Sequence, residues 1–157
     1  MYRQIFGVGP VGVCATIIVW MVFYFAGEGL SIPKMAIHPV LRGGMLFIFL
    51  IDAVYLLGGG ITALVRNGWG IKLVTTGPYQ FIRHPIYSVL IYSATGALAL
   101  WLYSWLLLAS VIPLSLFWSW LVQKEERYML ERFGAAYRAY MERTGQFFPS
   151  MKALKEE

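Results

Sequence analysis

Three long stretches without ionised side chains constrain this chain more than any other feature. Residues 4–27 contain no Asp, Glu, Lys or Arg, residues 43–65 contain only Asp52, and residues 84–123 again contain none. A helix needs roughly 20 apolar residues to cross a hydrocarbon core about 30 Å thick. The first two stretches therefore each predict one membrane span, over about residues 5–26 and 43–65.

The third stretch is too long for a single membrane helix. One helix over residues 86–121 would be about 54 Å long at 1.5 Å per residue, which tilting does not absorb. A hairpin resolves this, and Trp101 and Tyr103 are residue types expected at a turn beside the membrane surface. We predict spans over about residues 86–101 and 104–121. The predicted fold class is all-α: a polytopic membrane protein with four transmembrane helices, the last two forming a helical hairpin.

The basic residues predict the orientation. Four spans put the N-terminus, the loop over residues 66–85 and the C-terminal tail on one side of the membrane. That side then carries four Lys and Arg residues from positions before 124 and seven from position 124 onward. Only Lys34 and Arg42 lie opposite, so the division is 11 against 2, whereas three spans would give 4 against 9. Because Lys and Arg favour the cytoplasmic side, both termini are predicted to be cytoplasmic.

Composition agrees with a membrane protein and argues against other classes. Hydrophobic residues make up 59% of the chain and charged residues 13%, which is about half the charged share of soluble proteins. A soluble domain, a disordered chain and a nucleic-acid-binding protein are therefore disfavoured. The first apolar stretch is too long for a secretory signal, and a short chain without targeting signals fits a bacterial inner membrane. We expect residues 1–157 to form one domain.

The segment after Gln123 is polar, with apolar residues such as Met129, Phe133 and Tyr137 recurring at helical spacing. This pattern predicts an amphipathic cytoplasmic helix over residues 122–142, which Gly134 weakens or bends. The single cysteine allows neither an intramolecular disulfide nor a cysteine-based zinc site, and no metal is expected.

Two groups of polar residues meet on the predicted cytoplasmic side. Arg83 and His84 end the loop before Pro85, and Glu125 and Glu126 follow the fourth span. Free N–H groups at a helix start beside an arginine favour an anion, and the two Glu side chains favour a cation. A ligand carrying both an ammonium and a carboxylate would bridge them. Taken singly, the same residues also fit a snorkelling arginine, a capping histidine and a solvated helix face.

One long motif connects these residues. It reads Gly77-Pro78-Tyr79-Gln80-Phe81-Ile82-Arg83-His84-Pro85-Ile86-Tyr87, and the apolar hairpin, Glu125-Glu126, Phe133-Gly134, Tyr137 and Tyr140 follow it. Over about residues 64–149 the chain resembles the isoprenylcysteine carboxyl methyltransferase family and the related phospholipid N-methyltransferases. The resemblance implies S-adenosylmethionine as methyl donor, bound at the cytoplasmic mouth between the loop, the last two spans and the C-terminal helix. It also implies an acceptor embedded among membrane lipids, either an isoprenylcysteine-like carboxylate or a lipid.

The resemblance further implies which residues line the donor site. Glu125 would hold a polar end of the cofactor, with Glu126 as second choice, and either Arg83 or Arg127 is a candidate for orienting the acceptor. The implied cofactor-binding residues are Leu73, Val74, Gly77, Tyr79, Arg83, His84, Pro85, Tyr87, Glu125 and Glu126. Eukaryotic prenylcysteine enzymes are expected to have a substrate-binding arginine four residues before the Glu, where this chain has Leu121. The acceptor group, carboxylate, amine, thiol or hydroxyl, therefore stays open, and no catalytic residue is assigned.

Asp52 is the one charged residue within the predicted spans, and such residues are functional candidates because burying them is costly. We expect it to shape a lipid-facing pocket or to join Tyr92, Ser93 or Ser115 in a helix-packing contact. Two other functions remain open. One is a membrane reductase similar to the sterol reductases, with NADPH in the same mouth, and the other is a non-enzymatic channel or structural subunit. The small size and the Glu pair favour methyl transfer.

Overall fold

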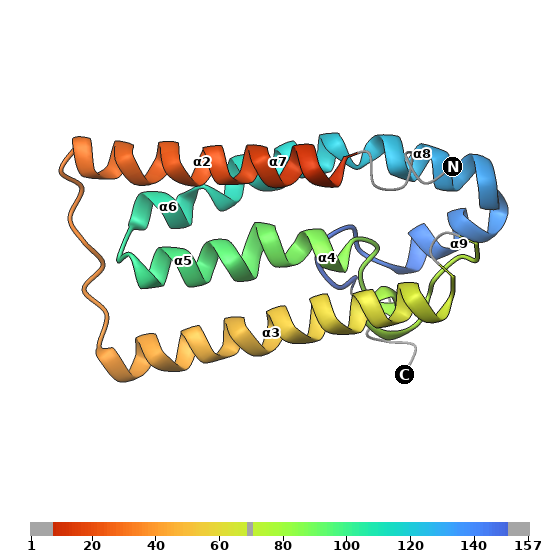
Figure 1. Cartoon of the computed structure of the whole chain (residues 1–157), viewed down its shortest axis with the longest axis horizontal. Helices are drawn as coiled ribbons and strands as arrows, with labels where there is room; N and C mark the ends of the chain where they lie inside the picture. Colours follow the sequence, from red (N-terminus) through yellow and green to blue (C-terminus); the bar gives the residue numbers. More distant parts are fainter. Residues whose placement is uncertain (1–7, 69–70, 151–157) are drawn as a thin grey trace.

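The computed structural model describes residues 8–68 and 71–150, which form an elongated helical bundle (Figure 1). The predictions for Arg3, for the start of the first span, for residues 69–70 of the loop and for Lys152 and Lys155 lie outside the described residues. Two long helices lie on opposite sides of the bundle, and shorter helical segments lie between them and beyond their ends (Figure 1). The all-α prediction is confirmed for the described residues.

The two long helices are α2, Gly9–Gly29, and α3, Pro39–Arg66. At 1.5 Å per residue they are about 31 and 42 Å long, enough to cross a hydrocarbon core. Both expose large apolar side chains, among them Val22, Phe25, Phe47 and Leu50. Soluble monomers rarely expose apolar surface on this scale. Together with a third helix over Trp105–Phe133, they are the three described helices long and apolar enough to span a membrane.

The predicted helical hairpin is present. Its first arm, Pro85–Trp101, comprises α4, Pro85–Ser88, the π-helical turn η2, Val89–Ala94, and α5, Thr95–Trp101. The second arm begins with α6, Trp105–Ala109, and continues as α7, Val111–Leu121. Ser104 lies at the turn and caps α6 by accepting a hydrogen bond from the Leu107 N–H. With 17 residues, about 25 Å, the first arm is shorter than a usual span. That this arm also crosses the membrane, which would bring the number of spans to four, stays a prediction.

The C-terminal helix differs from the prediction in its boundaries. The backbone stays helical through Val122, so α8, Gln123–Phe133, continues the second arm of the hairpin. The chain turns only at Gly134, whose φ of 52° is a conformation that favours glycine. A short helix, α9, Ala135–Arg143, then follows. The expected single helix over 122–142 is thus two helices, and Glu125 and Glu126 extend the hairpin arm instead of starting a separate element.

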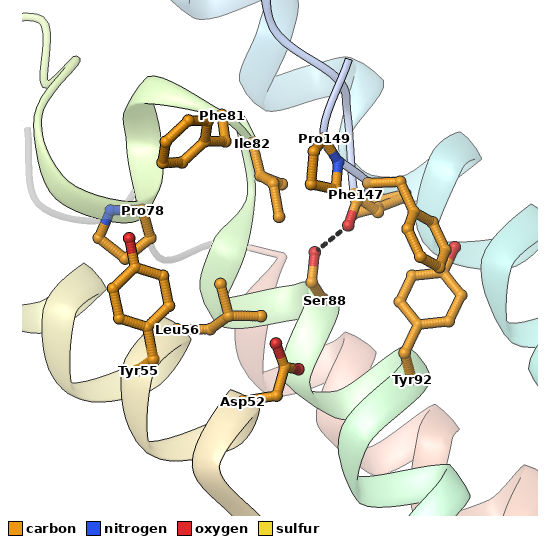
Figure 2. A pocket seen from close by; sticks show the side chains of 11 residues that line it. Asp52, Tyr55, Leu56, Pro78, Phe81, Ile82, Ser88, Tyr92, Phe147 and Pro149 are labelled. Atoms are coloured by element: carbon orange, nitrogen blue, oxygen red, sulfur yellow. Dashed lines mark hydrogen bonds between the residues drawn. The ribbon is translucent and has the colours of Figure 1, made fainter. Parts of the chain in front are cut away.

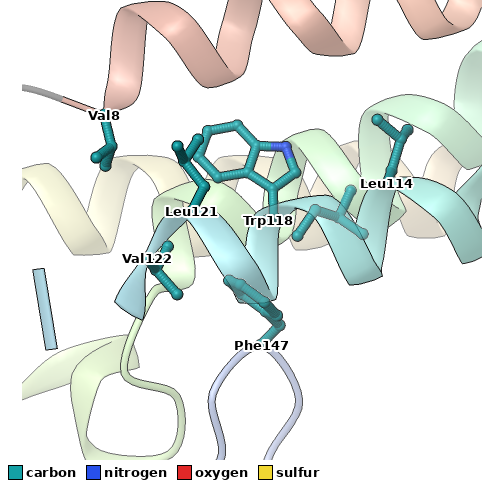
Figure 3. Close-up of a cluster of buried hydrophobic side chains, with 7 residues drawn as sticks. Val8, Leu114, Trp118, Leu121, Val122 and Phe147 are labelled. Atoms are coloured by element: carbon teal, nitrogen blue, oxygen red, sulfur yellow. The ribbon is translucent and has the colours of Figure 1, made fainter. Parts of the chain in front are cut away.

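A buried tryptophan, Trp118, joins the second arm of the hairpin to α2 (Figure 3). The Trp118 ring on α7 is fully buried, and its Nε1 donates a hydrogen bond to Thr16 Oγ1 of α2 at 3.0 Å. A Cβ at Gly12 would lie 2.2 Å from the same ring, so only glycine lets the two helices approach this closely. Phe147 belongs to the same cluster and anchors the segment that follows α9.

The π-helical turn brings the hairpin against both long helices. Thr95 Oγ1 donates to the Leu90 carbonyl five residues back, and Trp20 of α2 donates its Nε1 hydrogen to Thr95 Oγ1. Ser93 in the same turn donates to the Asp52 carboxylate of α3. Such wide turns are often found at functional sites. Ser93 is one of the three partners predicted for Asp52.

The described basic residues separate to the two ends of the bundle. Lys34 and Arg42 lie at the end where the hairpin turns, Lys34 paired with Glu28 and Arg42 over the Tyr103 ring. At the opposite end, which we call the site end, lie the last turn of α3, α8 and α9 (Figure 1), and their basic residues are Arg66, Lys124, Arg127, Arg132, Arg138 and Arg143. Lys72 lies in the loop that follows α3, and Arg83 of the same loop contacts Glu126 of α8. This separation agrees with the charge argument, and the cytoplasmic orientation stays a prediction.

Candidate active site

The site end is built on two neighbouring glycines of α3. Gly77–Gln80 form a short 3-10 helix, η1, whose Pro78 lies against Gly59, where a Cβ would be 2.9 Å from the Pro78 ring. Gly60 similarly leaves room for Pro85 and Ile86 at the start of α4. The glycines that interrupt the apolar stretch therefore let the loop pack directly on the helix. This contact positions the residues after Pro78.

Arg83, His84 and Glu126 form the centre of a polar cluster at this end. Arg83 Nε donates to Glu126 Oε1 at 3.0 Å, and His84 Nε2 lies 3.2 Å from the same oxygen. All three side chains are about 10% exposed. Burial favours a higher pKa for Glu126, but the hydrogen bond with His84 and the charges of His84 and Arg83 outweigh it and hold the pKa at about 2. Glu126 is therefore ionised near neutral pH.

Residues 144–149, which we call the C-terminal strap, cross the cluster beside the loop. The Arg83 N–H donates to the Gly145 carbonyl at 2.8 Å, and the His84 N–H donates to the Gln146 carbonyl at 3.1 Å. Arg83 Nη1 also donates to the carbonyls of Met141 and Thr144. The guanidinium is thus engaged by α9, the strap and α8 at once.

Glu125 lies on the other side of His84, and its negative charge is stabilised by weaker contacts than that of Glu126. Its Oε1 accepts a hydrogen bond from the Tyr87 hydroxyl at 2.9 Å, and its Oε2 is 3.8 Å from His84 Nδ1. Burial raises the pKa of Glu125 above its usual value, and the His84 ring and the hydrogen bond from Tyr87 only partly oppose this. Glu125 is the acidic group of the cluster that the chain's own cations satisfy least.

Aromatic side chains surround these carboxylates. The Tyr87 ring stacks on Trp118 with centroids 4.5 Å apart, and His84 lies 5.7 Å from Tyr87 and 5.8 Å from Phe147. Tyr79 is half-buried, and burial together with the charge of Glu125 raises its pKa. Its carbonyl accepts a hydrogen bond from the Tyr140 hydroxyl, which ties η1 to α9.

The structure brings together some of the residues expected at the cofactor. Arg83, His84, Tyr87, Glu125 and Glu126 share the contacts described above, with Tyr79 beside them. The other four face elsewhere or have no described contact with the cluster: Gly77 and Pro85 lie against α3, Val74 is buried and Leu73 is half-buried. Their role at a cofactor stays a prediction.

Sequence reasoning missed the C-terminal strap. Gln146 donates its Nε2 hydrogen to Glu126 and accepts from Ser119, and Phe147 packs on His84 while its carbonyl accepts from Ser88. A side chain at Gly145 would collide with the Phe148 carbonyl, at 1.6 Å from a Cβ. That glycine, followed by two aromatic residues within the region of resemblance, was the available signal.

A second feature adjoins the cluster, a pocket of about 180 Å³ between α3, the start of the hairpin and the strap (Figure 2). We call it the Asp52 pocket. Its lining is mostly apolar and includes Asp52, Tyr55, Leu56, Pro78, Phe81, Ile82, Ser88, Tyr92, Phe147, Phe148 and Pro149. None of the ten residues expected at the cofactor lines it. Ser88 and Phe147 separate it from His84, because Ser88 Oγ contacts the carbonyls of both His84 and Phe147.

Comparison with known proteins identifies a family. A family model described as phospholipid methyltransferase matches residues 45–136, more than half of the chain. The matched region contains most of α3, the loop, the hairpin and both glutamates of the cluster. No curated protein matches the chain.

Proposed function

Because the chain belongs to the phospholipid methyltransferase family, we propose that it transfers a methyl group from S-adenosylmethionine to a lipid-like acceptor at the cytoplasmic face of a membrane. Family membership and the long apolar helices make it an integral membrane methyltransferase. The donor, the acceptor and the side of the membrane are the parts that we propose.

The observation that carries the donor assignment is the surplus negative charge of the polar cluster. Among the residues that the structure describes, it contains two carboxylates, Glu125 and Glu126, but only one permanent cation, Arg83, whose ionic contact is with Glu126. Glu125 is left with a tyrosine hydroxyl and a histidine ring 3.8 Å away. S-adenosylmethionine carries an ammonium and a sulfonium against one carboxylate, so it is a net cation. Binding it beside Glu125 would balance the charge of a largely buried site.

The remaining residues fit the shape of such a donor. Tyr87, His84 and Phe147 supply aromatic faces for a flat base or a cation. The Tyr87 hydroxyl orients Glu125, and Trp118 fixes the Tyr87 ring from behind. When bound, the donor supplies a sulfonium methyl group, and the acceptor's lone pair forms the new bond as the carbon–sulfur bond breaks with its electron pair left on sulfur. Burial of the cluster keeps water from competing as acceptor.

These residues need to position the acceptor, and only some acceptors also need to be activated. A carboxylate acceptor is ionised near pH 7 and requires no base, whereas an amine acceptor first loses a proton to water. The acceptor would enter sideways from the bilayer, since an apolar tail gains nothing by leaving lipid. Orientation in the reaction then depends on helix packing around the cluster.

Charge also separates methyl transfer from the reductase alternative. NADPH carries several phosphate charges, and a cluster with one carboxylate in excess would repel them. Arg83, the cation that a phosphate would need, already contacts Glu126 and two backbone carbonyls. The same charge balance that favours a cationic donor therefore disfavours a nicotinamide cofactor.

The test is calorimetric titration of the detergent-purified protein with S-adenosylhomocysteine and, separately, with NADPH. We expect micromolar binding of S-adenosylhomocysteine that Glu125→Gln weakens about 10- to 100-fold, the loss of one charge-assisted hydrogen bond. The matched control is Glu131→Gln, the same change at an exposed position of α8, which should bind as the wild type does. Binding of NADPH alone, or equal effects of the two substitutions, would overturn the proposal.

A further inference from the structure

We propose that Tyr137 of α9 is a further binding residue of the donor site, and that its hydroxyl donates a hydrogen bond to the carboxylate of the methyl donor. This inference rests on the proposed function, because it concerns the same cofactor. Tyr137 and Tyr140 lie one turn apart in α9, and both side chains are buried at the site end.

The two tyrosines differ in what their hydroxyl groups contact. The Tyr140 hydroxyl donates to the Tyr79 carbonyl at 2.6 Å and so connects α9 to the loop. Within residues 8–68 and 71–150, by contrast, no group forms a hydrogen bond with the Tyr137 hydroxyl. Because a buried tyrosine hydroxyl usually finds a partner, Tyr137 is an exception that needs a cause.

The Tyr137 hydroxyl faces an opening and not the closed interior. Only 2% of the residue is exposed. Every fully buried side-chain nitrogen or oxygen of the described residues has a hydrogen-bond partner, so a hydroxyl without one belongs to the small exposed part of its residue. The ring is therefore enclosed by its neighbours, while the oxygen at its tip is accessible to a ligand.

This opening lies beside the polar cluster. Arg83 Nη1 donates to the Met141 carbonyl, one turn beyond Tyr137 in α9. Electrostatic interactions connect the tyrosine hydroxyl with Glu126, Arg83 and Glu125. Burial raises the pKa of the Tyr137 hydroxyl, and the charge of Glu126 adds to this increase. At neutral pH the group is therefore a protonated hydrogen-bond donor at the edge of the cluster.

A donor held at Glu125 would bring a group that the cluster does not otherwise satisfy. In S-adenosylmethionine the ammonium and the carboxylate are attached to the same carbon atom, so an ammonium at Glu125 keeps the carboxylate nearby. The Arg83 guanidinium is already engaged by Glu126 and by two backbone carbonyls. A carboxylate that leaves water needs another hydrogen-bond donor. The Tyr137 hydroxyl is such a donor, and no described residue uses it.

Tyr79 is the other tyrosine of the site whose hydroxyl has no partner among the described residues, but its electrostatic surroundings differ. The charge of Glu125 acts on the Tyr79 hydroxyl and would repel an anion bound there. At Tyr137 the positive charge of Arg83 opposes that of the glutamates. An anion that accepts from Tyr137 therefore also gains attraction from Arg83, which favours Tyr137 as the partner of the carboxylate.

The test compares two ligands that differ only in this carboxylate. S-adenosylhomocysteine and its decarboxylated analogue, which keeps the adenosine, the thioether and the amine, would be titrated into the detergent-purified protein in a calorimeter. We expect Tyr137→Phe to weaken S-adenosylhomocysteine roughly 10- to 100-fold, the loss of one hydrogen bond to a charged group, and to leave the affinity for the analogue unchanged. Equal weakening of both ligands, or weakening of neither, would contradict the inference.

Tyr140→Phe is the matched control, since it is the same change at a buried tyrosine one turn along α9. It removes the hydrogen bond to the Tyr79 carbonyl, so it should lower the denaturant midpoint of unfolding and change the affinity for both ligands equally. Tyr137→Phe removes a hydroxyl that has no described partner and should leave the midpoint unchanged. A lower midpoint in Tyr137→Phe, with the same loss of affinity for both ligands, would show a structural role and refute the inference.

Glu125→Gln separates this inference from the proposed function. Both ligands carry the amine that Glu125 is proposed to hold, so this variant should weaken both, whereas Tyr137→Phe should weaken only one. If the wild type binds neither ligand, the donor assignment fails and the role of Tyr137 fails with it. If Glu125→Gln weakens both ligands but Tyr137→Phe does not discriminate between them, the donor assignment stands and the inference about Tyr137 fails alone.

Discussion

Replacing Arg83 by methionine should destabilise the protein by about 3 kcal/mol at neutral pH. Methionine keeps an unbranched apolar stem of similar length but removes every donor of the guanidinium. Those donors connect the loop to three later elements: α8 through Glu126, α9 through the Met141 carbonyl, and the C-terminal strap through the Thr144 carbonyl. The substitution therefore tests whether Arg83 holds the site end together.

The typical cost of breaking a buried ion pair gives the magnitude, and the pKa of Glu126 gives an upper bound on the share of Arg83. Removing one partner of a buried ion pair typically costs about 3–5 kcal/mol, and the Arg83 and Glu126 side chains are each 11% exposed. Separately, the pKa of Glu126 is about 2 against an ordinary 4.5. That difference corresponds to about 3 kcal/mol at pH 7, and because His84 contributes more to it than Arg83 does, it is an upper bound on the share of Arg83.

The assay is unfolding in detergent with guanidinium chloride, followed by tryptophan fluorescence, for which the fully buried Trp118 is a reporter. The sign of the pH dependence comes from a depressed carboxyl pKa. Stabilisation is fully present above the unfolded value of 4.5 and is lost as the pH falls towards about 2. The gap between wild type and Arg83→Met should therefore shrink over this range.

Arg127→Met is the matched control, because Arg127 is exposed on α8 and its loss should change stability by less than about 0.5 kcal/mol. The double variant Arg83→Met, Glu126→Gln should be more stable than the sum of the single losses predicts, since the two residues are in contact. Equal stabilities of Arg83→Met and Arg127→Met, or strictly additive losses, would refute the reasoning.

Three further outcomes are expected from the geometry. Gly12→Ala should cost about 1–3 kcal/mol in the same unfolding assay, because its Cβ would lie 2.2 Å from the Trp118 ring, whereas Gly43→Ala, with no neighbour within 4 Å, should be neutral or stabilising. Binding of S-adenosylhomocysteine, followed by calorimetry, should weaken as the pH falls through the raised pKa of Glu125, and Glu125→Gln should flatten this dependence. Tyr87→Phe removes a hydrogen bond that lowers the Glu125 pKa, so its binding profile should shift to higher pH.

Local patterns in the sequence predicted most of the elements. The charge-free stretches located α2, α3 and the hairpin, since a helix without charges for about 20 residues has few alternatives to a membrane. The same patterns indicated the turn near Tyr103, where an apolar run too long for one span must reverse. They also indicated the meeting of Arg83 and His84 with the two glutamates, because a hairpin returns the chain to the side from which it started.

The contacts of the C-terminal strap were beyond prediction. Nothing in the composition of residues 144–149 indicates that Gln146 reaches Glu126, or that Phe147 joins the core around Trp118. These contacts depend on the chain reversing at Gly134 and again after α9, and two short reversals multiply the directions that the C-terminal strap could take. For the same reason three hydroxyl partners were equally suitable for Asp52, and only the π-helical turn selects Ser93.

The shortness of the hairpin's first arm has its cause in the same packing. Pro85 can occupy only the first turn of a helix, where its missing N–H is not needed. Gly59 and Gly60 let the start of α4 pack against α3 at a level several residues before α3 ends at Arg66. The arm is therefore 17 residues long, and the loop before it lies deep enough for Pro78 and Ile82 to line the Asp52 pocket. The same loop therefore contributes Pro78 and Ile82 to the Asp52 pocket and Arg83 and His84 to the polar cluster. The glycines of α3 thus set how closely the loop that carries the polar cluster packs on the helix that lines the Asp52 pocket.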